Sequence, residues 1–269
     1  MQQDSLQWKS WRTYRECASS WFYTTVAFLL LTIFFLLASA TDDRLFNEIS
    51  VWSKPFKFAL SFAMYFATLL IFARYLPLGY LRKGMGRLIA VSITFVALGE
   101  MAYLTIQSAL GEASHFNSTT SFHALMYVLM GIGATWLVAA PLGLGWVIGR
   151  NSAKNNPMVL SIIIGLGLTF ILGGGFGGYL SSQTSHWVNA AATDANGILL
   201  FNWATDGGDL RVAHFFGLHA MQAVPLFALL LPKKMRNNTA SALGVTFSVV
   251  YAAFSVHTFV QAIQGQPFL

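Results

Sequence analysis

Residues 211–231 read RVAHFFGLHAMQAVPLFALLL. The run is about as long as the ~20 residues that a helix needs to cross a bilayer. Its first half nevertheless carries two imidazoles and an amide, those of His214, His219 and Gln222. Such side chains are costly at membrane depth and usually face a bundle interior or a wet cavity. The run therefore predicts a transmembrane helix with a polar stripe.

The composition extends this prediction to the whole chain of 269 residues, of which 55 % are hydrophobic and 10 % charged. A soluble domain carries about 25 % charged residues, so this chain is predicted to be an integral membrane protein. The fold class that we expect is all-α, a bundle of seven transmembrane helices. The expected spans are 20–40, 55–76, 88–110, 120–149, 157–181, 211–231 and 239–263. The single cysteine, Cys17, excludes a disulfide within the chain.

Charge predicts the orientation. If the N-terminus is cytoplasmic, most of the 16 Lys and Arg residues fall in the short inner segments or at their borders, as the positive-inside rule requires. We therefore expect a multi-pass protein of the bacterial inner membrane with a periplasmic C-terminus. The basic residues lie at membrane borders, where lipid headgroups explain them and nucleic acid does not. Residues 1–19, with Trp8, Trp11 and Tyr14, predict an interfacial N-terminal segment before a seven-helix domain over 20–269.

With this orientation, all six histidines lie on the outer side or in the outer half of the membrane: His115, His123, His186, His214, His219 and His257. Four predicted spans can bring Glu100, His123, His219 and His257 towards one region. Three of these spans also place an amide on the face of the ionisable residue, and these amides belong to Gln107, Gln222 and Gln261. His214 is about 140° from His219 around a helix, so we assign His219 to the interior and His214 to the interface or an outer rim.

Three imidazoles and a carboxylate suit Zn²⁺, iron or copper, and two facing histidines suit haem b. The leading hypothesis is a metal- or haem-centred, redox-active membrane protein with His123, His219 and His257 as metal ligands. Glu100 would be a fourth ligand or a catalytic proton-transfer group, and Gln107, Gln222 and Gln261 would support the bound group. Lys57, beside Pro55 at a helix start, would bind an anionic group such as a haem propionate or serve as an interfacial anchor.

Three alternatives stay open. The same polar cluster could serve a proton-coupled transporter or sensor without a metal, although apolar spans with few breaks argue against transport. A metal-dependent intramembrane hydrolase is the second, and a structural subunit with hydrogen-bonded helices is the third. The expected partners are membrane lipids and a small or lipid-like substrate, while the oligomeric state stays open. The glycine-rich run 165–178 predicts close helix packing, and the apolar stretch GILLF, 197–201, predicts a segment that dips into the interface.

Three stretches, SKPFKFALS (53–61), SHFN (114–117) and RVAHFFGLHA (211–220), resemble a group of polytopic bacterial membrane proteins without an assigned activity. The resemblance covers most of the chain and implies no function. Ceramidase-like and progestin-receptor-like membrane hydrolases also have seven spans. Their late His-x-x-x-His motif is His214-x-x-x-x-His219 in this chain, and Glu100 stands where Asp is expected. That similarity is architectural only.

Overall fold

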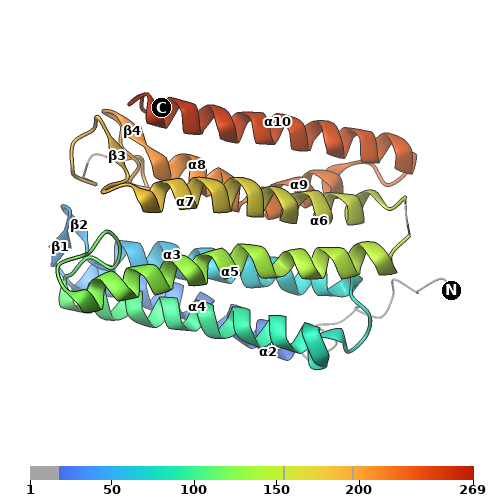
Figure 1. The fold of residues 1–269 in the computed structure, drawn as a ribbon, viewed down its shortest axis with the longest axis horizontal. Helices are drawn as coiled ribbons and strands as arrows, with labels where there is room; N and C mark the ends of the chain where they lie inside the picture. The colour runs from blue at the N-terminus through green and yellow to red at the C-terminus, as the bar shows by residue number, and fades with distance from the viewer. Residues whose placement is uncertain (1–17, 154, 196) are drawn as a thin grey trace. The chain divides into compact units, whose positions relative to one another are not determined.

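The structure is a computed structural model that describes residues 18–153, 155–195 and 197–269 (Figure 1). Six of its helices are long and apolar enough to cross a membrane, and a bent helix pair makes a seventh candidate if it is one span. Such a set of helices is that of a multi-pass membrane protein. Cys17 and the rest of the predicted interfacial segment 1–19 lie outside the described residues, apart from Ala18, which precedes the first described helix, and Ser19, which begins it.

The described chain forms two compact units. Unit 1 contains residues 18–43 and 51–110, and unit 2 contains residues 44–50 and 111–269. The prediction of one seven-helix domain over 20–269 stays a prediction.

Unit 1 consists of α2 (Ser19–Thr41), α3 (Ser53–Phe72) and α4 (Gly84–Leu110), with short 3₁₀ turns at Ala73–Tyr75 and Tyr80–Arg82. Each of the three helices packs on the other two. The core between α2 and α3 is aromatic, because the Phe28 ring lies 5.0 Å from that of Phe62 and 5.8 Å from that of Phe66. One polar contact joins the ends of these helices, since Trp52 Nε1 donates to Asp42 Oδ2 at 2.8 Å.

Unit 2 contains the remaining helices. These are α5 (Ser121–Asn151), α6 (Pro157–Leu168), α7 (Gly175–Ser182), α8 (Leu210–Leu218), α9 (Ala220–Leu230) and α10 (Asn237–Ile263). The starts of α5 and α6 follow ordinary capping rules. The hydroxyl of Thr120 caps α5, while the Asn156 side chain caps α6 just before Pro157.

Two of the expected spans of unit 2 are irregular. A π-helical segment, η3 (Thr169–Gly174), joins α6 to α7, within the glycine-rich run. The expected span 211–231 is two helices, α8 and α9, which meet at His219 with a bend of 51°. The expectation of few breaks therefore has one exception in unit 2, at His219.

Two short pairs of antiparallel strands complete unit 2. Strands β1 (Leu45–Phe46) and β2 (Ile49–Ser50) are antiparallel, and the two turn residues Asn47 and Glu48 have φ of 50° and 65°. Positive φ at both positions gives the turn twist that two-residue hairpins prefer. Strands β3 (Trp187–Val188) and β4 (Gly208–Asp209) pair just before α8, with Trp187 opposite Asp209.

Candidate functional sites

The first candidate site is a polar face of α4 inside unit 1. Glu100 and Gln107 lie seven residues apart on one side of this helix, and their exposed fractions are 8 % and 2 %. Glu100 Oε1 and Gln107 Oε1 are both buried without a hydrogen-bond partner. Most buried polar atoms in proteins have a partner, so two orphan oxygens on one helix face mark this face as unusual.

A carboxyl group in such surroundings has few stable forms. An isolated carboxylate in an apolar medium is very costly, so the group must gain a proton, a cation or a hydrogen-bond donor. Intramembrane carboxyl groups accordingly belong to proton relays and ion pathways in many membrane proteins. Chemically, the α4 face can therefore take up and release a proton. The role of Gln107 in supporting a bound group stays a prediction, as does that of Lys57, which is half-buried near the start of α3.

The second candidate site is the meeting point of η3 with the α8–α9 break in unit 2. Thr169 Oγ1 donates to the Leu218 carbonyl oxygen at 3.2 Å and accepts from Met221 N at 2.9 Å. One hydroxyl thus bonds a carbonyl and an amide on the two sides of the bend. This satisfies the rule that non-helical backbone at membrane depth must find partners within the protein.

His214 and Tyr251 complete the same arrangement. His214 Nδ1 lies 3.0 Å from the Gly173 carbonyl oxygen, and because a carbonyl can only accept, this nitrogen carries the hydrogen. The Tyr251 hydroxyl donates to the Phe216 carbonyl oxygen at 2.8 Å. The assignment of His214 to the interface or an outer rim stays a prediction, and its ring packs so closely on α7 that a Cβ on Gly177 would lie 2.6 Å from it.

His219 stands at the bend itself. Its Nδ1 lies 3.3 Å from Gln222 Oε1, and the Phe215 ring meets the imidazole edge to face at 4.2 Å between centroids. The i, i+3 spacing that sequence reasoning used for this pair therefore holds across the first turn of α9. What the spacing could not reveal is that the backbone is broken at the histidine.

The other proposed ligands of the metal lie elsewhere in unit 2. His123 begins α5, where its Nε2 lies 3.4 Å from Glu112 Oε2 and its Nδ1 lies 3.0 Å from the Thr120 hydroxyl. His257 is exposed on α10, and Gln261 donates to the Pro267 carbonyl oxygen. Across residues 18–153, 155–195 and 197–269, no group of three His, Cys, Asp or Glu side chains could hold a metal ion. The ligand roles of His123, His219 and His257 stay predictions.

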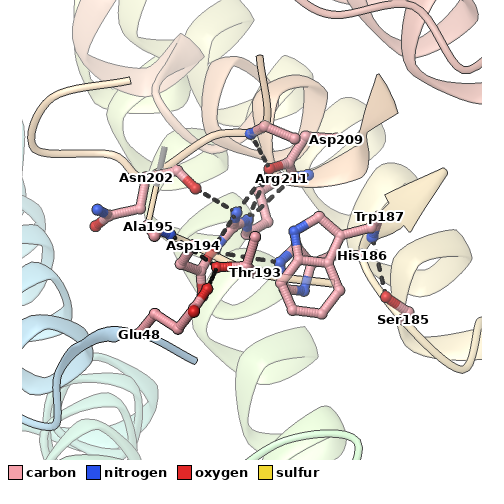
Figure 2. Close-up of polar contacts among 11 residues, drawn as sticks. Glu48, Ser185, His186, Trp187, Thr193, Asp194, Ala195, Asn202, Asp209 and Arg211 are labelled. Atoms are coloured by element: carbon pink, nitrogen blue, oxygen red, sulfur yellow. Dashed lines mark hydrogen bonds and ion pairs between the residues drawn. The ribbon is translucent and has the colours of Figure 1, made fainter. Parts of the chain in front are cut away.

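The third candidate site, at the end of unit 2 that carries β3 and β4, is a buried ion cluster centred on Arg211. Figure 2 shows its guanidinium between the carboxylates of Asp194 and Asp209. Arg211 Nη2 lies 2.9 Å from Asp194 Oδ1 and 2.7 Å from Asp209 Oδ2, and it donates to the Asn202 carbonyl oxygen at 2.6 Å. Asp209 also caps α8, because its Oδ1 accepts from Arg211 N at 2.9 Å.

His186 adds a titratable group to this cluster. Its Nε2 lies 3.8 Å from Asp194 Oδ1, too far for a hydrogen bond, and is buried without a hydrogen-bond partner. Burial lowers the pKa of His186 below its ordinary 6.5, and the charge of Arg211 adds to this while Asp194 and Asp209 oppose it. With His186 neutral, two carboxylates face one guanidinium, so the cluster carries one net negative charge.

Asp194 connects the cluster to the β1–β2 hairpin. Its backbone N–H donates to the Asn47 carbonyl oxygen at 3.2 Å, and the neighbouring Thr193 hydroxyl bonds the Glu48 carboxylate (Figure 2). Burial alone would raise the pKa of Asp194, but the His186 and Arg211 side chains outweigh it and hold that pKa at about 2.

This cluster was not predicted from the sequence. Asp209 two residues before Arg211 at a helix start was a usable local signal, since Asp is a favoured N-cap. The contact of Asp194 with Arg211 joins residues 17 positions apart through an irregular loop, and no sequence period marks such a contact.

No protein-family model matches this chain, and neither a curated protein nor a solved structure matches it.

Proposed function

We propose that this protein is a proton-coupled transporter of a small solute, with seven spans, a cytoplasmic N-terminus and a place in the bacterial inner membrane. Glu100 is the proton-binding group. The observation that carries this proposal is the buried Glu100 carboxyl group, whose Oε1 has no hydrogen-bond partner within unit 1. Gln107, two turns further along the same face, gives a transferred proton or water a second polar contact.

The break in unit 2 supports transport as the coupled activity. Discontinuous helices commonly form the solute sites of secondary transporters, because the irregular backbone lines the site. At the α8–α9 bend, His219 Nδ1 lies 3.3 Å from Gln222 Oε1, and the bend packs beside an irregular π segment. We assign solute recognition to these two side chains, whose imidazole and amide suit a polar, uncharged or anionic solute.

A metal centre has less support, and no observation favours a haem. The metal centre needs His123, His219 and His257 at one point, and the described residues include no three-residue group of His, Cys, Asp or Glu able to hold a metal. An intramembrane hydrolase needs the same centre. No specific observation raises either function above transport.

The test is the electrical response of proteoliposomes to a pH jump, measured on a solid-supported membrane. The wild-type protein should give a transient current as protons enter the α4 face, and Glu100→Gln should abolish it. Asp43→Asn is the matched control, since Asp43 is an exposed carboxylate just after α2 in the same unit. A Glu100→Gln protein that elutes as a single species and gives the wild-type current would overturn the proposal. Solutes that change the current in wild type, and not in Gln222→Ala, would then identify the cargo.

A further inference from the structure

A short turn just before α8, residues 197–203, is held in one conformation by its own backbone. Ile198 N donates to the Trp203 carbonyl oxygen at 2.9 Å. The Ile198 carbonyl oxygen accepts from Phe201 N at 3.1 Å and from Asn202 N at 2.7 Å. Three bonds across so few residues close the turn on itself.

Two residues of this turn adopt left-handed backbone conformations, Leu200 with φ of 74° and Asn202 with φ of 56°. Asn visits this region readily, whereas a bulky residue such as Leu rarely does. Strained positions of this kind persist where the surroundings enforce them and often mark functional segments. In this turn conformation the Leu199 and Leu200 side chains project outward, with exposed fractions of 91 % and 49 %.

The base of the turn is anchored to α8 and to the C-terminal segment. Trp203 is 5 % exposed, and its ring stacks on Phe201 at 4.4 Å and meets Phe268 edge to face at 5.7 Å. The bond from Arg211 to the Asn202 carbonyl oxygen, at 2.6 Å, ties the turn to the ion cluster. The two leucines are therefore held at a rigid tip.

The tip lies next to membrane-spanning chain. Leu210, the first residue of α8, follows Leu200 by ten positions, and α8 with α9 is the bent candidate span. Residues 197–204, GILLFNWA, carry no charge that would hold them in water. The β1–β2 hairpin, which bonds to Thr193 and Asp194 of the same unit, likewise exposes Leu45 by 66 % and Phe46 by 37 %. This hairpin connects two candidate spans, so it too lies at a membrane border.

We propose that the turn 197–203 inserts Leu199 and Leu200 into the acyl-chain border of the adjacent leaflet and serves as a fixed lipid anchor beside α8. Lipid is the occupant because the tip is apolar, uncharged and continuous with a spanning helix. Burial of two leucines in lipid removes the cost of exposing them to water. The anchor depends on this surface alone and is independent of the transport proposal.

The test places a fluorophore at the tip. In a Cys17→Ser background, Leu199→Cys is labelled with an environment-sensitive dye and reconstituted into phosphatidylcholine liposomes. Ala192→Cys is the matched control, because Ala192 is exposed in the same loop region and precedes the apolar turn. We expect the dye at position 199 to be quenched by lipids with a nitroxide high on the acyl chain, and several-fold less by aqueous iodide than the dye at 192.

Equal iodide quenching at the two positions, with no quenching by the labelled lipids, would overturn the proposal. Protection of position 199 in native membranes that is lost in pure liposomes would also overturn it, since that result assigns the tip to a protein partner. Leu200→Cys provides a second reporter if the protein labelled at position 199 does not reconstitute.

Discussion

The α8–α9 break in unit 2 and the polar face of α4 in unit 1 deal with buried polar groups in opposite ways. At the break the backbone is irregular, yet Thr169, His214 and Tyr251 bond its carbonyl and amide groups. On α4 the helix is regular, yet Glu100 and Gln107 each keep a buried oxygen without a partner.

The difference separates Thr169, His214 and Tyr251, whose bonds hold the break, from Glu100 and Gln107, each of which has an oxygen without a partner. A bonded buried group stabilises the fold, and its removal leaves its partners unpaired. An orphan group lowers stability and persists where another role requires it. Substitutions of Thr169, His214 or Tyr251 should therefore reduce stability, whereas substitutions at Glu100 should reduce function and leave stability unchanged or higher.

The largest expected effect is that of Thr169→Val, which keeps the shape of the side chain and removes its hydroxyl. The Leu218 carbonyl and the Met221 amide both lose their bond, so the free energy of unfolding should fall by about 2–4 kcal/mol. Denaturant unfolding in detergent measures it. Thr135→Val is the control, since the Thr135 hydroxyl bonds only the Gly131 carbonyl of its own helix. Equal losses of stability in the two variants would show that the Thr169 hydroxyl does not specifically stabilise the break.

The next effect concerns the close approach of η3 and α8. A Cβ on Gly217 would lie 2.6 Å from Gly173 N, so Gly217→Ala must push two backbones apart and should cost about 1–3 kcal/mol. Gly167→Ala is the control, because nothing lies within 4 Å of the Cβ that it adds. It should be neutral or stabilising by up to about 1 kcal/mol, as in an ordinary helix. Thermal unfolding of the two variants shows whether the loss of stability comes from the close packing at Gly217 or from the replacement of any glycine.

The ion cluster predicts a loss of stability in acid. The pKa of Asp194 is about 2 in the folded protein against an ordinary 3.8, so the unfolded chain binds the proton more tightly. The stability that this group supplies, on the order of 2 kcal/mol, is complete above about pH 4 and is lost towards pH 2. His186 has the same sign, since its pKa is also lowered, and it begins to act as the pH falls below 6.5.

Unfolding as a function of pH measures both contributions. Asp194→Asn should flatten the curve at the acid end, and His186→Gln should flatten it just below neutrality. Unchanged curves would show that the cluster does not couple proton binding to folding.

The smallest expected change in stability is that of Glu100→Met. The substitution removes a buried carboxyl group without breaking a bond of Oε1, so the free energy of unfolding should stay within about 1 kcal/mol of wild type or rise. Equilibrium unfolding in detergent measures it. A loss as large as that of Thr169→Val would mean that Glu100 is structural and would erase the contrast between the two regions.

Hydrophobic periodicity and length located the helices well. The expected spans 157–181 and 239–263 correspond to Pro157–Ser182 and Asn237–Ile263, because apolar length is what a bilayer requires. The polar stripe of α4 was also readable, since Glu100 and Gln107 are seven residues apart. The bend at His219 could not be predicted from the sequence, because the hydrogen bonds that permit it come from Thr169, 50 residues earlier. The Asp194–Arg211 pair was hidden for the same reason.

The most direct test of the central claim is infrared difference spectroscopy of wild-type and Glu100→Gln protein through a pH titration in lipid. A protonated carboxyl group has a carbonyl stretching band that its carboxylate lacks. We expect a band in the wild type that disappears as the pH rises and is missing from Glu100→Gln, while Asp43→Asn keeps it. Identical titrations of wild type and Glu100→Gln would contradict the assignment of Glu100 as the proton-binding group.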